Sequence, residues 1–394
     1  MEGSCSKRRR VADPAHANGG DLLSAVPDDV ILHVMSFLTT RQAVRTSLVS
    51  RRWRNLWRSV PCINVNINEF LPSGTELTDD DLEREFAFKM FMEKVVELRD
   101  PTALIRTFLF RCCRLDGFEG IADMEDINGW ISHALQKQPR VMDIAVMYDA
   151  LHLDHSVFTC SYLTRIKLTN IILMDGFFKQ LETGCPVLEN LFLFGGVVVD
   201  TEISSRTLKD LTIIETDFHN KRISFSTPSV TNLEFWRQDI CVTNLPLLVT
   251  SLLVLKDIQN SSDFCRTLKS LSAAKVLKFD YFGRKLRINN NLQWYPKFNN
   301  LVRLTLGQWC LDANFYGLIV FLQNSPKLEE LTLELEKETT QRIIGELEER
   351  SFTCEHLRSV EIVCWEDDPQ VKDVVEFFVD SGLTSDQVRK VHWY

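Results

Sequence analysis

The sequence CPVLENLFLF at residues 185–194 is nearly matched, much later in the chain, by SPKLEELTLE at residues 325–334. In both stretches the leucines follow the spacing apolar-x-x-apolar-x-apolar, at positions 188, 191 and 193 and again at 328, 331 and 333. The last two positions alternate with other residues, as in a strand that buries one of its faces. A short unit that recurs in this way predicts a repeat protein.

The same unit recurs along most of the chain. After the first step, successive units begin about 19 to 29 residues apart, which is the spacing of leucine-rich repeats. One repeat alone cannot cover its apolar side chains, but stacked repeats share a continuous core. The sequence therefore predicts an α/β fold, a solenoid with parallel strands on its concave face and helices or turns on its convex face. The units begin at Ile105, Val141, Leu163, Leu188, Leu208, Val230, Val249, Ala274, Leu301, Leu328 and Leu357.

The repeat register also predicts which side chains face the concave surface. On each strand, the residues between and after the last two apolar positions should point away from the core. This rule brings Phe192, Phe194 and Trp236 together as an exposed aromatic patch, and exposed apolar patches often mark binding sites. We therefore expect these three residues to bind a substrate, with burial of the rings beneath a loop as the alternative.

The N-terminal part of the chain has a different pattern, which indicates short helices. Pro27-Asp28-Asp29 suits a first helical turn, and the apolar residues between positions 30 and 38 recur at helical spacing. Six arginines lie between Arg41 and Arg58, a stretch without lysine or acidic residues. About 40 residues form a marginal core alone. This part should complete its core with a partner or against the rest of the chain, to which a helix over residues 79–99 would join it.

Composition and charge exclude several function classes. The chain has 394 residues, of which 45% are hydrophobic, and a formal net charge of −9, so general affinity for nucleic acid or anionic membranes is not expected. No apolar run is long enough to span a bilayer. The first 20 residues lack the apolar stretch of a secretory signal. The 11 cysteines contain no Cys-x-x-Cys pair and are expected to be reduced thiols. We expect a location in the nucleus, the cytoplasm or both.

No catalytic constellation is present in the sequence. It contains no Gly-x-Ser-x-Gly elbow, phosphate loop or dinucleotide fingerprint. His152 and His155 lie close to Asp154, but no second cluster of metal-binding residues accompanies them. We predict a binding protein that is not an enzyme and has no catalytic residue, cofactor or metal. The basic run Lys7-Arg8-Arg9-Arg10 is either a nuclear localisation signal or a solvated tail.

Two stretches near the N-terminus resemble the F-box motif. They are VPDDVIL at residues 26–32, which leads to Phe37-Leu38, and AVRTSLVS at residues 43–50, which is followed by RRWRNLW. Val26 departs from the leucine that is usual in the motif. An F-box followed by irregular leucine-rich repeats is similar to the plant F-box/LRR-repeat families. Residues 353–362 and 374–378 are similar to the FBD module at the C-terminus of many such proteins.

This resemblance implies a function that composition does not show. F-box proteins bind the Skp adaptor of SCF-type cullin–RING ubiquitin ligases, and their repeats hold the protein that is to be ubiquitinated. The chain would then be a non-catalytic substrate-recognition subunit whose partners are the Skp adaptor, through it cullin, and an unknown protein substrate. Neither nucleic acid nor membrane is implied. By position, the adaptor-binding residues would be Val26, Pro27, Ile31, Leu38, Val49, Ser50, Trp53 and Trp57.

The predicted organisation has four parts. Residues 1–20 form a disordered basic tail and residues 21–62 a three-helix F-box. Residues 63–352 form the linker helix and the leucine-rich-repeat solenoid, and residues 353–394 an FBD-like segment that closes it. Two alternatives stay open: an adaptor-binding interaction protein, or a repeat scaffold, that is not assembled into an active ligase.

Overall fold

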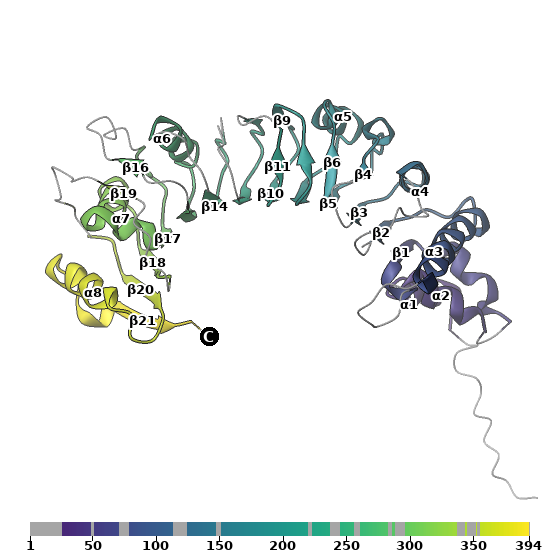
Figure 1. Cartoon of the computed structure of the whole chain (residues 1–394), viewed down its shortest axis with the longest axis horizontal. Coiled ribbons are helices and arrows are strands. Elements are labelled where there is room, and N and C mark those ends of the chain that lie inside the picture. Colours follow the sequence, from purple (N-terminus) through teal and green to yellow (C-terminus); the bar gives the residue numbers. More distant parts are fainter. Residues whose placement is uncertain are drawn as a thin grey trace, which may run out of the picture.

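The described part of the chain forms an open arc whose inner side is lined by strands, with most helices on the outer side (Figure 1). The fold thus agrees with the predicted α/β solenoid. The computed structural model describes residues 26–48, 51–70, 79–112, 124–146, 151–219, 223–236, 245–255, 261–282, 286–287, 296–336, 343–344, 352 and 355–393.

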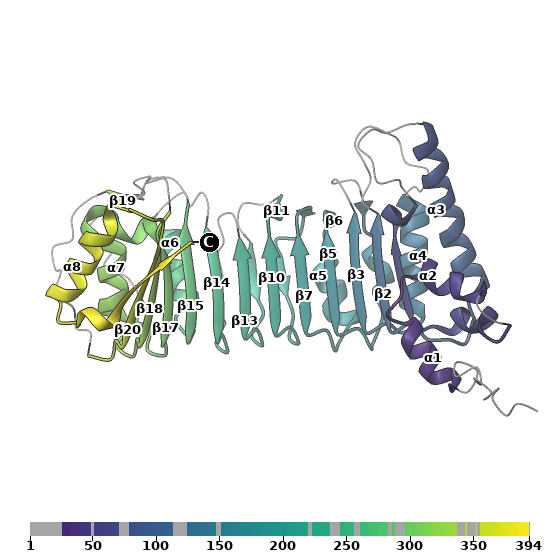
Figure 2. The same ribbon diagram turned by 90° about the horizontal axis from the view of Figure 1, so that it is seen from below.

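One sheet of thirteen strands runs through the described residues from one end of the arc to the other (Figure 2). Every neighbouring pair of its strands is parallel. In sheet order the strands are β1 (Cys62–Asn66), β2 (Thr107–Cys112), β3 (Val141–Val146), β5 (Arg165–Thr169), β7 (Asn190–Phe194), β10 (Asp210–Ile214), β13 (Asn232–Trp236), β14 (Thr250–Leu255), β15 (Val276–Tyr281), β17 (Arg303–Gly307), β18 (Glu330–Glu334), β20 (Ser359–Cys364) and β21 (Val388–His392).

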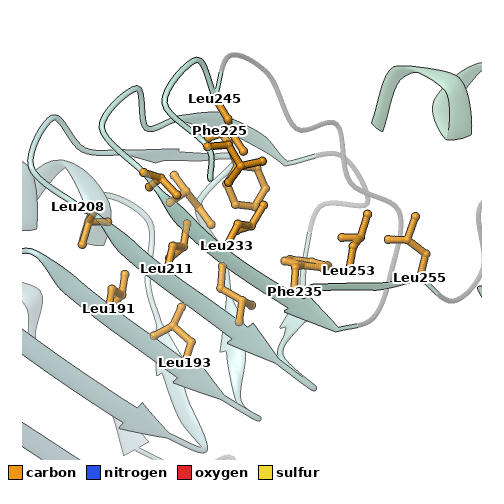
Figure 3. Packing of buried hydrophobic residues seen from close by; sticks show 14 of the residues in the cluster. Leu191, Leu193, Leu208, Leu211, Phe225, Leu233, Phe235, Leu245, Leu253 and Leu255 are labelled. Atoms are coloured by element: carbon orange, nitrogen blue, oxygen red, sulfur yellow. The ribbon is translucent and has the colours of Figure 1, made fainter. Parts of the chain in front are cut away.

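The strands stack almost without register shift, so equivalent side chains form rows across the sheet. Leu191 pairs with Leu211, which pairs with Leu233 on the next strand, and all three are buried. Figure 3 shows these leucines on the same side of the sheet as the other core residues. Because the rows join successive repeats, the described residues share one apolar core that extends from Ile63 to Leu383.

The unit predicted at Val249 is displaced by one residue. Leu248 and Leu253 are buried, whereas Val249 is 39% exposed. Since side chains alternate along a strand, a shift of one residue exchanges its two faces. The prediction was therefore wrong for this repeat, and the structure places Ser251 in the core at a position where the pattern required an apolar side chain.

The unit predicted at Val141 is displaced by two residues. Met142 pairs with Phe108 and Ile144 pairs with Phe110, so the repeat begins before Val141. A shift of two residues keeps the same face toward the core, and for this reason the alternation alone could not detect it.

The convex side changes its structure along the arc. Helices cover its two ends, and short strands replace them between α5 and α6 (Figure 1). The convex helices are α4 (Met124–Gln136), α5 (Phe177–Gly184), α6 (Ser261–Ser270), α7 (Asp312–Asn324) and α8 (Gln370–Asp380); the short strands between α5 and α6 include β8 (Val197–Val198), β9 (Glu202–Ser204), β11 (Asp217–Phe218) and β12 (Ser224–Ser226).

The N-terminal module, defined here as residues 26–60, lies at one end of the arc. It contains α1 (Asp28–Met35), α2 (Thr40–Arg45) and two 3-10 stretches, Thr46–Leu48 and Trp53–Ser59, where the sequence predicted a third α-helix. The predicted helix over residues 79–99 is α3 (Asp79–Leu98). Across the described ranges, no helix has the length and apolar character needed to cross a membrane.

Candidate functional site

The N-terminal module is built on a small apolar core of its own. Ile31 and Met35 of α1 pack with Val60 and Cys62, which follow the last 3-10 stretch, and these four side chains are buried. Around them lie the half-buried side chains of Val26, Leu32, Trp53 and Leu56. The stripe of α1 that includes Ile31 therefore faces into the module.

Local sequence explains where the two helices begin. Pro27 precedes α1 with the extended backbone that its ring permits, and Asp28 and Asp29 lie at the positive end of the helix. Before α2, Thr39 and Gln42 form a capping box: the Gln42 amide donates to Thr39 Oγ1 at 3.3 Å, and the Thr39 amide donates to Gln42 Oε1 at 3.1 Å.

The structure divides the residues predicted to face an adaptor. Ile31 and Trp57 are buried, and Val26, Leu38 and Trp53 are partly buried. Pro27 is exposed. Val49 and Ser50 lie outside the described residues. Most of the described members of the set thus support the module from within.

A second apolar stripe of the module faces outward and was not among the predicted site residues. It consists of Val30, Val34, Phe37 and Leu48, whose exposed fractions range from 45% to 87%. We call these four residues the outer stripe. The spacing i, i+4, i+7 of its first three members was visible in the sequence, but it was read together with the spacing of Ile31 as one face. The structure separates the two.

The arginines of the module have different surroundings. Arg52 forms an ion pair with Asp28 at 2.5 Å, and the Arg41 guanidinium lies 4.3 Å from the centre of the Phe70 ring. Arg45, Arg51 and Arg54 are exposed, and none of them forms an ion pair with a described residue. The module therefore presents an excess of positive charge beside its apolar surface.

The concave aromatic residues lie on β7 and β13, which are separated in the sheet by β10, in a register that follows the prediction. Phe194 pairs with Ile214, and Ile214 pairs with Trp236 on the next strand. Phe194 is 37% exposed and Trp236 is 39% exposed, whereas Phe192 is half-buried, with the Lys167 ammonium 4.7 Å from the centre of its ring. We call Phe192, Phe194, Ile214 and Trp236 the concave patch.

A model of the F-box domain matches residues 23–64. The F-box protein At3g03040 of Arabidopsis thaliana is 26% identical over 372 residues, covering 80% of this chain and 76% of that protein. The F-box/LRR-repeat protein At3g58900 of the same plant is 26% identical over 338 residues, covering 76% of this chain and 98% of that protein. The chain contains an F-box and is similar to plant F-box/LRR-repeat proteins over 80% of its length. Similarity at this level also extends to the putative F-box/LRR-repeat protein At3g58880, with 25% identity over 361 residues.

The F-box is joined to the solenoid through β1. Thr40 of the F-box accepts a hydrogen bond at its Oγ1 from the Asn64 amide at 2.8 Å. Buried Arg99, at the end of α3, donates to the Val60 carbonyl at 2.6 Å. Burial lowers the pKa of Arg99 to about 10 and raises the pKa of the neighbouring Cys62 thiol to about 11. These contacts hold the F-box against the first strands of the sheet.

The described residues of this F-box/LRR-repeat protein contain no group of three or more His, Cys, Asp or Glu side chains that could hold a metal ion. His152 Nδ1 lies 3.4 Å from Met174 Sδ, and His155 lies in the next 3-10 turn. The seven described cysteines are free thiols, and most of them are buried.

Proposed function

We propose that this protein is the substrate-recognition subunit of an SCF-type cullin–RING ubiquitin ligase, in which the F-box binds a Skp adaptor and the repeats bind a protein substrate. The observation that carries the proposal is the outer stripe: four large apolar side chains are exposed on an F-box that lies at one end of a long solenoid. Large exposed apolar side chains that gather on one module are typical of an interaction site.

The division of roles within the F-box follows from burial. The outer stripe, beside exposed Pro27, would contact the adaptor, while Ile31, Trp53 and Trp57 maintain the shape of the module. Arg45, Arg51 and Arg54 would favour an acidic partner face and speed association with it. Leu38 is half-buried. We include it in the adaptor-binding surface, together with Val49 and Ser50, because of their positions in the F-box motif.

The ubiquitin-transfer chemistry would belong to the other subunits of the complex. F-box/LRR proteins are generally non-catalytic adaptors, and this chain would act by holding a substrate near a transfer centre supplied by its partners. A location in the nucleus or the cytoplasm is part of the proposal, as are the division at residues 20, 62 and 352 and the FBD character of residues 353–394. The described residues of this C-terminal segment include β20, α8 and β21.

The adaptor interaction can be tested with the double variant Val34→Glu, Phe37→Glu. Both side chains are exposed, so the charges should leave the folded state intact and lower adaptor binding at least tenfold, because carboxylates would be placed in an apolar interface. The measurement is co-purification of the tagged full chain with adaptor and cullin. Val379→Glu, which alters an exposed valine on α8 at the other end of the arc, is the matched control.

Three results separate the alternatives. Retrieval of both adaptor and cullin by the wild type, and of neither by the double variant, supports the ligase subunit. Retrieval of adaptor without cullin favours an interaction protein outside an active ligase. If the wild type retrieves neither, the adaptor role is wrong and a repeat scaffold is the better description.

A further inference from the structure

The concave patch is flanked on one side by cations that form no ion pair with a described residue. Arg165 and Lys167 lie on β5, the strand next to Phe192 and Phe194, and Lys167 is the register partner of Phe192. Neither cation forms an ion pair with a described residue. Instead, the Lys167 ammonium lies over the Phe192 ring. An apolar surface therefore adjoins uncompensated positive charge.

Two acidic side chains near the patch have partners within the molecule. Asp143 pairs with Arg111 at 3.1 Å, on the far side of Lys167 from the patch. Asp210 accepts hydrogen bonds from the side-chain amides of Asn190 and Asn232, which flank it in the register. Arg165 and Lys167 thus remain the cations beside the patch that a partner carboxylate can reach.

The far side of the patch has the opposite charge. Glu234 lies on β13 and accepts a hydrogen bond from Trp236 Nε1 at 3.0 Å. It remains a carboxylate that would repel an acidic group placed over β13. An acidic partner residue is therefore favoured over β5 and disfavoured over β13, which gives a bound segment a direction.

From these observations we infer that the concave patch binds an extended protein segment in which an acidic side chain lies about four residues from a large apolar one. This inference rests on the proposed function and names the class of substrate. The acidic side chain meets Arg165 and Lys167, and the apolar side chain packs against Trp236 on β13. Three strand spacings separate β5 from β13, about 14 Å, which an extended chain spans in about four residues.

The geometry favours a carboxylate over a phosphate. Phosphate groups are typically bound by several arginines in bidentate contacts, whereas β5 offers one arginine and one lysine on alternate residues of a strand. Asp143 lies next to Lys167 in the register, and one of its buried carboxylate oxygens has no hydrogen-bond partner in the described part of the chain. The negative charge of Asp143 repels a doubly charged phosphate group more strongly than it repels a carboxylate with a single charge.

The test is a selection of displayed random 12-residue peptides on the purified full chain, followed by affinity measurements with the enriched peptides. We expect enrichment of peptides with Asp or Glu three to five positions from Trp, Phe, Tyr or Leu. Lys167→Glu should weaken their binding at least tenfold, and replacing the acidic peptide residue with lysine should restore binding to that variant. Lys179→Glu, on the convex helix α5, makes the same charge change and should have no effect.

Other results would overturn the inference. These are the absence of an enriched peptide, enrichment of peptides without an acidic residue, and equal binding to the Lys167→Glu and Lys179→Glu variants. Tighter binding when the acidic residue is replaced by phosphoserine would reject the carboxylate assignment. Adaptor capture is measured on the same preparations: if it succeeds while the peptide result fails, the inference alone is wrong, and if both fail, the proposed function is wrong.

Discussion

Among single residues, Asp280 on β15 has an unusual environment. Its carboxyl packs against Gly307 of the next strand so closely that a Cβ on Gly307 would lie 2.0 Å from Asp280 Oδ1. Burial raises the pKa of Asp280 to about 7, helped by Glu336 and Glu334 and opposed by the Tyr281 amide and Lys278. The glycine is required there because any side chain would displace the carboxyl.

Asp280 should make the protein less stable as pH rises. The unfolded chain loses this proton near pH 4 and the folded chain near pH 7, so the folded state binds more protons between these values and its stability falls across that range. Asp280→Asn should remove this fall and stabilise the protein at pH 8 by up to about 4 kcal/mol relative to the wild type. Urea unfolding of both proteins at pH 5 and pH 8 tests this; equal pH dependence would contradict it.

Ser251 on β14 is a second residue whose replacement should stabilise the protein. The side chain is buried between Leu233 and Leu277, and its Oγ has no hydrogen-bond partner among the described residues. Ser251→Ala removes a buried, unsatisfied polar group and should raise the free energy of unfolding by about 1 kcal/mol. Denaturant unfolding is the measurement, and Ser226→Ala, which alters an exposed serine on β12, is a suitable control. Any loss of stability in Ser251→Ala would show that the hydroxyl has a partner.

At the scale of elements, the start of helix α5 is capped by a residue of the next repeat. Asp200 follows β8 and is buried, and its carboxylate accepts hydrogen bonds from the Gly176 amide at 2.6 Å and the Phe178 amide at 3.0 Å. Helix α5 has no side-chain cap from the residue that precedes it. The helix of one repeat is therefore completed by the next.

Removal of this cap should destabilise the solenoid at that point. Asp200→Ala leaves two amides at the start of α5 without acceptors and should lower the free energy of unfolding by about 2 kcal/mol. The control is Asp175→Ala, which alters an exposed carboxylate beside the same helix. Hydrogen exchange should also accelerate in α5 of the Asp200→Ala variant. Similar effects of the two substitutions would argue against a capping role.

The sequence predicted these elements where side chains follow a period, and failed where function or local packing interrupts it. Within each repeat, leucines such as Leu191 and Leu331 keep the same spacing to the apolar residues on either side, so the stack of parallel strands could be predicted. In β14 the core position is occupied by Ser251, which is polar, so the repeat was predicted to begin at the apolar Val249, one residue too late. For the F-box, the spacing of Val34 and Ile31 revealed an apolar helix, but only packing decides which half of its surface is covered.

At the scale of the whole molecule, the open arc should give the protein a large radius of gyration in solution. A compact protein of this length would have a radius of gyration of about 21 Å. The described residues instead form an extended arc (Figure 1), so small-angle X-ray scattering of the monomer should give a clearly larger value. A value near that of a compact sphere would contradict the open solenoid.

Strand β1 has a consequence for any attempt to move this F-box to another receptor. Val60 and Cys62 belong to the small core of the F-box, whereas Ile63 and Val65, directly after them, belong to the core of the repeats. A fusion joined at residue 62 would cut between the two cores and expose both. A transplant that retains residues through Phe70 would carry all of β1 but would still lack Arg99, which donates to the Val60 carbonyl. In the proposed ligase, the contacts across this junction would set the distance from adaptor to substrate.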